Sequence, residues 1–227
     1  MFHTIACLAA AVCLASVIGC GGGTSSGGGQ SVFVNILDIS LSPRAAVVNV
    51  GVPVHWVNNT NQPQEVLSGV LAPQPTATVT LIRITAGAIF SPPSTPANPI
   101  EANLGDTIRF SNDSTVFYTV SVFNDNNALV FQIPLSPGQL STVTNVFLSV
   151  GAGLYTFSIG GVGSSGAIVL FGNPQPNSGS ENSFISPLLG NGGTFTKNFT
   201  RAGSVSYYSP NLNNPTRSFK TGVITVN

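Results

Sequence analysis

Cysteine is almost absent from this sequence, and the few cysteines that occur lie within its first twenty residues. They are Cys7, Cys13 and Cys20. If the N-terminal segment is removed up to Gly19, only Cys20 is retained, and the body of the chain then has no disulfide, thiolate metal ligand or cysteine nucleophile. The only methionine is the first residue, and of the two histidines only His55 lies outside this segment. The body of the chain therefore offers no thiolate or thioether and only one imidazole as a metal ligand.

Charge is also scarce. Charged residues make up 6% of the chain, and seven Lys and Arg balance seven Asp and Glu, whereas a typical globular domain has about 25% charged residues. No basic patch or acidic run is present, which excludes nucleic acid as a partner. Apolar residues make up 42%, which is enough for a core and argues against disorder. Because so few groups titrate, we expect stability to vary little over a broad pH range, with no steep loss between roughly pH 7 and pH 4.

No apolar run is long enough to cross a membrane as a helix. The run Ile5 to Val17 has the length of a signal-peptide core. The following residues, V-I-G-C, resemble a bacterial lipobox, in which cleavage leaves a lipid-modified cysteine at the N-terminus. We therefore expect a signal peptide at 1–19, lipidation of Cys20 and a flexible Gly/Ser tether at 20–30. The protein is then exported and lipid-anchored to the bacterial cell envelope, facing the periplasm or the surface. The alternative is an ordinary secretory signal with a chance cysteine.

The rest of the chain predicts an all-β fold. Short apolar runs with a period of two residues, such as VPVHWV, TIRF, YTVSV and GVITV, are separated by Gly, Pro and Asn. No stretch keeps a helical period. Many short strands at regular spacing are typical of a β-sandwich or barrel.

An internal repeat divides this pattern into two copies. A shift of 54 residues aligns Asn49 with Asn103 and, without a gap, Trp56 with Phe110 and Asn58 with Asn112. Similar matches relate the C-terminal halves; the aligned pairs are Leu189 with Leu135, Tyr207 with Phe157 and Gly222 with Gly166.

The order of the copies predicts a domain insertion. The first half of one copy (31–71) precedes a complete second copy (76–172), and the missing half (178–227) follows it. The junctions APQPTAT (72–78) and GNPQPNSGSEN (172–182) are rich in Pro, Gly and Asn, as exposed linkers are. The competing interpretation is one larger, irregular sandwich.

The split copy consists of SLSPRAAVVNVGVPVHWVNNTNQPQEVLSG followed by SFISPLLGNGGTFTKNFTRAGSVSYYSPNLNNPTRSFKTGVITV. In this pattern of turns and strands it resembles the cupredoxins, the plastocyanin-like Greek-key sandwiches. The resemblance implies two Greek-key β-sandwich domains, the second inserted into a loop of the first. A type-1 copper site uses two His, one Cys thiolate and usually a weak axial Met.

Every copper-ligand position implied by the resemblance holds another residue. In the split copy the first His falls at Gln64, the Cys at Ser209, the second His within 211–214 and the Met at Lys220. In the inserted copy the corresponding positions are Tyr118, Ile159 and Ser164. The site is therefore interpreted as degenerate, and no cofactor is predicted.

His55 is interpreted as a solvated or intersheet residue. Strand alternation in VPVHWVN places Val54 and Trp56 on one face and His55 on the other. The alternative is a metal ligand with a neighbouring carboxylate such as Glu65. No nucleophile elbow or close pair of carboxylates indicates an enzyme.

Two functions of different classes follow. The first is a non-catalytic binding or structural module with an unknown protein or glycan partner. Its contact surface would use the aromatics Phe117, Tyr118, Tyr207 and Tyr208, and the former copper ends of both domains would meet in a composite groove. The second is an electron-transfer or copper-handling protein with a site that is not type 1.

Overall fold

The computed structural model describes residues 29–76, 78–141, 151–214 and 216–227, and within these ranges every regular element is a β-strand. The predicted signal peptide, the lipidation site Cys20 and most of the 20–30 tether lie outside the described residues. In the part of the chain that is described, no helix is long and apolar enough to span a membrane.

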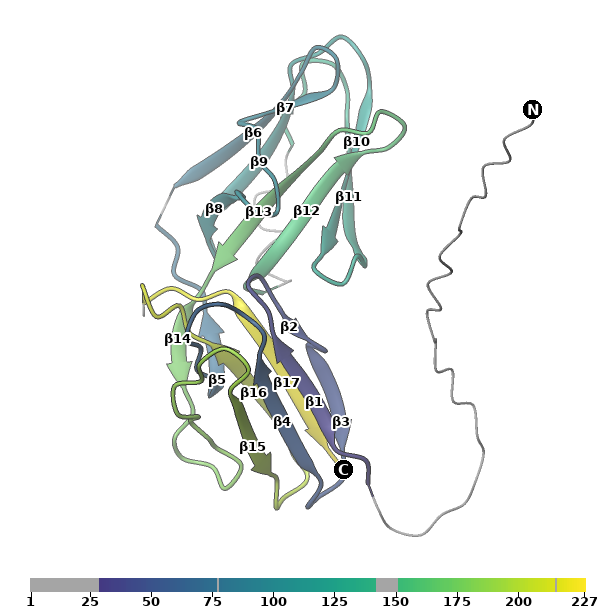
Figure 1. Cartoon of the computed structure of the whole chain (residues 1–227). Helices are drawn as coiled ribbons and strands as arrows, with labels where there is room; N and C mark the ends of the chain where they lie inside the picture. Colours follow the sequence, from purple (N-terminus) through teal and green to yellow (C-terminus); the bar gives the residue numbers. More distant parts are fainter. Residues whose placement is uncertain (1–28, 77, 142–150, 215) are drawn as a thin grey trace, which may run out of the picture.

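The strands form two sandwiches, which are the two lobes of Figure 1. The first sandwich contains β1 (Val32–Ile36), β2 (Leu41–Ser42), β3 (Ala45–Val48), β4 (Pro53–Asn58), β5 (Leu67–Ala72), β14 (Asn173–Pro176), β15 (Thr194–Asn198), β16 (Gly203–Ser209) and β17 (Lys220–Val226). The second contains β6 (Val79–Thr85), β7 (Ile89–Ser91), β8 (Ile100–Asn103), β9 (Thr107–Asn112), β10 (Tyr118–Asn124), β11 (Leu129–Leu135), β12 (Gly153–Ile159) and β13 (Ser165–Phe171).

Apart from β15, which has no counterpart among the described strands of the second sandwich, the two sandwiches have the same strand order. In the first, the sheets run β15-β4-β1-β2 and β14-β5-β16-β17-β3; in the second they run β9-β6-β7 and β11-β10-β12-β13-β8. The parallel pairs correspond as well, since β1 with β4 matches β6 with β9, and β17 with β3 matches β13 with β8. This is the Greek-key arrangement that the cupredoxin resemblance implies. The prediction of an all-β fold with one sandwich inserted into a loop of the other is confirmed.

Each sandwich has its own core, which excludes the single irregular sandwich. Trp56 fills the first core and its repeat partner Phe110 fills the second, both almost fully buried. Val54 is buried beside Trp56 while His55 lies on the opposite face, as strand alternation predicts. Close packing of an aromatic ring against the backbone also explains why glycine occupies two positions that the repeat aligns, Gly222 and Gly166. A Cβ at Gly222 would lie 2.3 Å from the Tyr207 ring, and a Cβ at Gly166 would lie 2.3 Å from the Phe157 ring.

The chain crosses between the sandwiches as a paired ribbon. The junction predicted at 172–182 is exposed over 175–181, as expected, but its first residues form a strand and not a free loop. Asn173–Pro176 form β14, which runs antiparallel to β5 from Gly69 to Ala72. The outgoing and returning segments thus satisfy each other's backbone groups. Proline and glycine content alone predicts a loop here, but β14 is an edge strand, where proline is tolerated.

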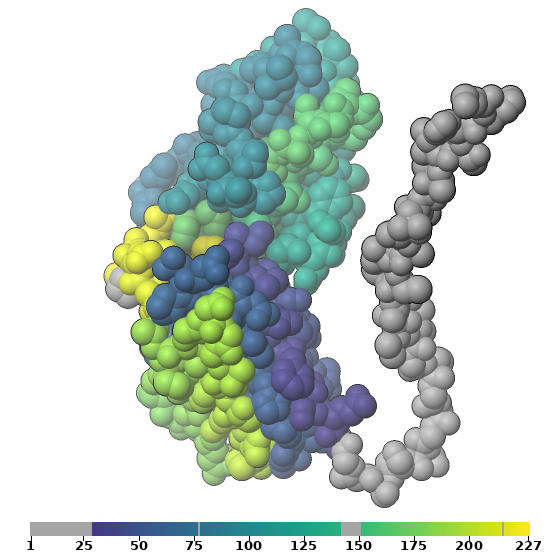
Figure 2. Space-filling model, viewed as in Figure 1, coloured from purple at the N-terminus to yellow at the C-terminus, as the bar shows by residue number. Residues whose placement is uncertain are grey.

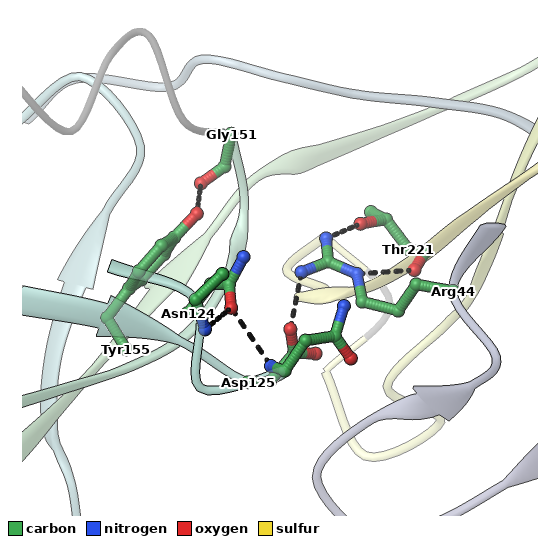
Figure 3. A network of polar contacts seen from close by, with 8 residues as sticks. Arg44, Asn124, Asp125, Gly151, Tyr155 and Thr221 are labelled. Carbon is green, nitrogen blue, oxygen red and sulfur yellow. Dashed lines mark hydrogen bonds and ion pairs between the residues drawn. The ribbon is translucent and has the colours of Figure 1, made fainter. Parts of the chain in front are cut away.

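The two sandwiches are in contact (Figure 2), and polar and aromatic side chains meet between them. Figure 3 shows Arg44 of the first sandwich between Thr221 on β17 and Asp125 of the second sandwich. Its guanidinium lies 2.8 Å from the Asp125 carboxylate and donates to the Thr221 hydroxyl at 2.7 Å. Elsewhere on the interface the Phe171 and Phe219 rings meet edge to face, with centroids 5.4 Å apart.

We expect Arg44→Met to loosen this interface. The Arg44–Asp125 pair is largely buried, with side chains 21% and 8% exposed, so removing one partner leaves a charge without its counter-ion. The free energy of unfolding should fall by about 1–2 kcal/mol in urea titrations. The control is Arg83→Met, which breaks an ion pair with Asp113 whose side chains are 52% and 38% exposed; it should cost less than about 0.5 kcal/mol. Equal losses for the two variants would contradict a special role for Arg44.

Candidate functional site

Three of the positions at which the resemblance places copper ligands come together in space in the first sandwich. The Lys220 ammonium donates to Gln64 Oε1 at 2.6 Å, and the Ser209 hydroxyl donates to the same oxygen at 3.2 Å. Residues that lie 145 and 156 positions from Gln64 in sequence therefore meet at its amide. The convergence agrees with the geometry implied by the resemblance, although the chemistry of the side chains has changed.

The local fold explains how these side chains meet. Ser209 ends β16 and Lys220 begins β17, and the two residues are directly paired across the antiparallel ladder. Gln64 lies in the loop after β4 and is held there by an isolated bridge, in which its backbone N–H donates to the Leu189 carbonyl at 2.9 Å. The Ser218 hydroxyl donates to the Ser209 carbonyl at 2.6 Å, which closes the loop between β16 and β17.

Lys220 places a positive charge where the resemblance places the axial methionine. Its side chain is almost buried, with 8% of the residue exposed. Burial lowers the pKa of Lys220 to about 8, and the negative charge of Asp38 opposes that shift in part. A second, longer hydrogen bond of 3.4 Å runs from the ammonium to the Leu37 carbonyl. Near neutral pH the centre of the former site thus holds an ammonium group.

A cavity of about 370 Å³ opens beside this cluster. Gln64, Ser209 and Lys220 form its polar wall, and Asn211 and Asn213, from the segment where the second His is expected, line it as well. Leu188 and Leu212 supply an apolar rim and are 61% and 44% exposed. The arrangement can hold a small molecule and donate hydrogen bonds to it, but it offers no imidazole or thiolate to a metal.

The corresponding positions of the second sandwich form no polar cluster. Tyr118 and Ile159 line a hollow of about 300 Å³. Ile159 is buried, and its backbone N–H donates to the Ser164 carbonyl at 3.1 Å. Tyr118 packs against the core with part of its ring exposed.

The aromatic contact surface predicted from the sequence is wrong in two of its four residues. Tyr207 and Tyr208 are each only 1% exposed: Tyr207 packs in the core of the first sandwich, and Tyr208, on the other face of β16, lies against Gly69 of β5. Burial raises the pKa of both hydroxyls. Phe117 is 57% exposed, and Tyr118 beside it is partly exposed. Of the four predicted residues, only Phe117 and Tyr118 can contribute to a contact surface.

The composite groove is also wrong, because the two sandwiches are joined head to tail. The Gln64–Lys220 end of the first sandwich faces the junction, where Ser218 and Gly172 exchange backbone hydrogen bonds. In the second sandwich β12 begins at the junction and ends at the far tip (Figure 1). Tyr118 begins β10, whose Val120 pairs with Ile159 at the end of β12, so Tyr118 and the preceding Phe117 lie at that tip. The two former copper ends are therefore separated by the length of a strand.

Metal ligands do not gather elsewhere in the ranges that the structure describes, where no group of three His, Cys, Asp or Glu side chains could hold an ion. His55 stacks on Phe33 with ring centroids 4.7 Å apart, and its Nδ1 is 2.8 Å from the Thr196 hydroxyl. It therefore has a ring neighbour and a hydrogen-bond partner on the outer face of the sheet.

A pair of buried asparagines is the structural feature that the sequence interpretation missed. Asn58 and Asn112 begin glycosylation sequons by pattern, yet both are 0% exposed. Asn58 Nδ2 donates to the carbonyls of Gln62 and Leu189, both at 2.8 Å. The signal was present in the repeat, since a shift of 54 residues aligns not only the asparagines but also Thr60 with Ser114.

No protein-family model matches this sequence. No curated protein matches it either. Among solved structures it is similar to a purple cupredoxin from Nitrosopumilus maritimus, at 18% identity over 40% of this chain and 98% of that chain, with a TM-score of 0.31. A Cu-containing nitrite reductase from Thermus scotoductus matches at 11% identity over 87% of this chain and 98% of that chain, with a TM-score of 0.22. A blue copper oxidase from Nitrosomonas europaea matches at 10% identity over 62% of this chain and 85% of that chain, with a TM-score of 0.23. Nothing about copper or catalysis is carried from these proteins to this chain.

Proposed function

We propose that this protein is an exported, lipid-anchored and non-catalytic binding module, in which a lysine occupies the former metal site. The observation that carries the proposal is the Gln64–Ser209–Lys220 cluster. Its ammonium group lies 2.6 Å from the amide oxygen that replaces the first imidazole. A metal cation entering here would meet the Lys220 ammonium and the neutral oxygens of Gln64 and Ser209, with Asp38 as the only carboxylate among the residues that line the cavity. Like charges at a few ångströms repel.

The placement of the chain ends is compatible with anchoring through Cys20. The described chain begins at Gly29, which lies against Val52, and the last residue, Asn227, accepts a hydrogen bond from the Val50 N–H at 3.0 Å. Both ends therefore lie at the pole of the first sandwich that faces away from the junction (Figure 1). A tether from Cys20 would hold the protein by that pole and leave the second sandwich pointing away from the membrane.

The far tip of the second sandwich is the contact surface that we propose for a protein or glycan partner. Phe117 and the neighbouring Val116 are 57% and 53% exposed, and Val162 on the turn after β12 is 50% exposed. Tyr118 lines the adjacent hollow. Exposed aromatic side chains supply contact area with little loss of conformational entropy, which favours their use in binding.

Metal analysis of the mature, tag-free protein tests the lysine-filled site. We expect less than stoichiometric copper after incubation with Cu²⁺ and dialysis, and no thiolate-to-copper absorption. Stoichiometric copper would instead support the electron-transfer or copper-handling function. In a parallel arm, the Phe117→Ala/Tyr118→Ala variant should capture less envelope protein or glycan than wild type. Phe33→Ala, which removes another ring that is 57% exposed, is the matched control and should bind as wild type does.

A further inference from the structure

The cavity beside Lys220 is amphipathic. Its inner wall carries the Lys220 ammonium and the polar groups of Ser209 and Gln64, while Leu188 and Leu212 stand at its rim. Its volume of about 370 Å³ lies in the range of small-molecule sites, about 300–1,000 Å³. Such a shape selects a molecule with one polar end and one apolar end.

The Lys220 ammonium forms no ion pair among the described residues, although the negative charge of Asp38, which lines the same cavity, acts on it. The ion pairs found among those residues involve Arg44, Arg83, Arg201 and Arg217, and none involves Lys220. Both acceptors of Lys220, the Gln64 amide and the Leu37 carbonyl, are neutral. A buried cation without an anionic partner is costly, because desolvation is not repaid by an opposite charge. An ammonium group also has three donors, and two of them are accounted for by these acceptors.

We propose that this cavity binds a small carboxylate with a short apolar group. The carboxylate would accept a charge-assisted hydrogen bond from Lys220, and the Asn211 side chain, which lines the same cavity, offers a further donor. The apolar group would lie between Leu188 and Leu212. The inference rests on the proposed binding function and names the chemistry of a ligand for it.

Asp38 is the other charged residue that lines the cavity. Its negative charge repels a bound carboxylate and therefore lowers the affinity of the cavity for that ligand. Glu65 follows Gln64 in sequence but does not line the cavity. We therefore expect opposite effects from the two charges: loss of the charge at Lys220 should abolish carboxylate binding, and loss of the charge at Asp38 should strengthen it.

The experiment is a titration of the mature protein with sodium hexanoate at pH 7, followed by NMR chemical shifts and calorimetry. We expect saturable binding, at least about tenfold weaker in Lys220→Met and for the neutral probe hexan-1-ol, because a hydrogen bond to a charged group is lost. Asp38→Asn should bind several times more tightly than wild type; Asp38 is exposed, so this variant leaves the core untouched. Acetate should bind more weakly than hexanoate, because it lacks the apolar group.

The outcomes separate this inference from the proposed function. Equal binding of hexanoate by wild type and folded Lys220→Met, equal binding of hexan-1-ol, or no shift up to about 10 mM hexanoate would each overturn the carboxylate site. Those results leave the lysine-filled, copper-free module standing, because that proposal depends on the copper titration. If Lys220→Met does not fold, unchanged or weaker binding by Asp38→Asn overturns the inference by itself.

Discussion

Replacing Lys220 with methionine is expected to abolish a rise in stability that the wild-type protein shows between about pH 8 and pH 10. Lys220 is nearly buried, and its burial lowers the pKa of its ammonium from 10.5 to about 8. Between these two values the unfolded chain still holds the proton while the folded chain has released it. The free energy of unfolding therefore increases with pH in this window.

The size of the rise in the free energy of unfolding follows from the difference between the pKa values of Lys220 in the unfolded and folded chain. Each pH unit over which the two states differ by one proton changes the free energy by about 1.4 kcal/mol, so we expect about 2–3 kcal/mol by pH 10. Above pH 10 the buried tyrosines act in the opposite direction. Burial raises the pKa of Tyr155 to about 12, and it also raises the pKa of Tyr207 and Tyr208. The unfolded chain then loses phenolic protons that the folded chain keeps, and stability falls.

Urea unfolding at intervals from pH 6 to pH 11 would measure both limbs. Wild type should show a maximum near pH 10, and Lys220→Met should show only the fall above it. The control is Lys197→Met, which removes the other lysine of the chain, on β15; the rise should persist in it because Lys220 is intact. A wild-type protein whose stability is flat from pH 7 to pH 10 would contradict the buried ammonium.

Lys220 also shows why the sequence predicted the place of the site but not its chemistry. The resemblance placed Gln64, Ser209 and Lys220 at equivalent ligand positions, and the structure brings these three side chains together. A count of charged residues cannot say that Lys220 is buried without an ion-pair partner, because burial depends on strands far apart in sequence. The sequence predicts a weak pH dependence over a broad range, whereas the buried ammonium predicts a rise in stability above about pH 8.

The fold of each sandwich was easier to predict from the sequence than the connection between the two sandwiches. Period-two runs and the repeat identify the sandwiches because core positions such as Trp56 and Phe110 recur at a fixed shift. The joint has no such periodicity. Proline and glycine at 172–182 predict an exposed loop, whereas the pairing of β14 with β5 depends on the return path of the inserted sandwich. The head-to-tail arrangement, which separates Phe117 from Lys220, is likewise set by tertiary contacts such as Arg44 with Asp125.

Asn58 and Asn112 are expected to be among the most sensitive positions in the molecule. In each sandwich the asparagine lies at the end of a strand, fully buried, with its amide facing carbonyls of two different segments. Asn112 Nδ2 donates to the carbonyls of Val116 at 2.7 Å and Leu135 at 3.0 Å, as Asn58 does to Gln62 and Leu189. The side chain thus ties the loop after its strand to a segment from the other half of the sandwich.

Asn58→Ala should lower the free energy of unfolding by about 3 kcal/mol, because it removes the buried side chain that donates to the Gln62 and Leu189 carbonyls and accepts from the Thr60 N–H. Asn112→Ala should cost a similar amount, and the two losses should add because the residues lie in separate cores. Asn59→Ala is the matched control: its amide makes an exposed hydrogen bond to the Asn35 side chain, and its loss should cost less than about 0.5 kcal/mol. Urea titrations of the four proteins decide the matter. If Asn58→Ala were as stable as Asn59→Ala, the repeated asparagine would have no structural role, and its recurrence at a shift of 54 residues would need another explanation.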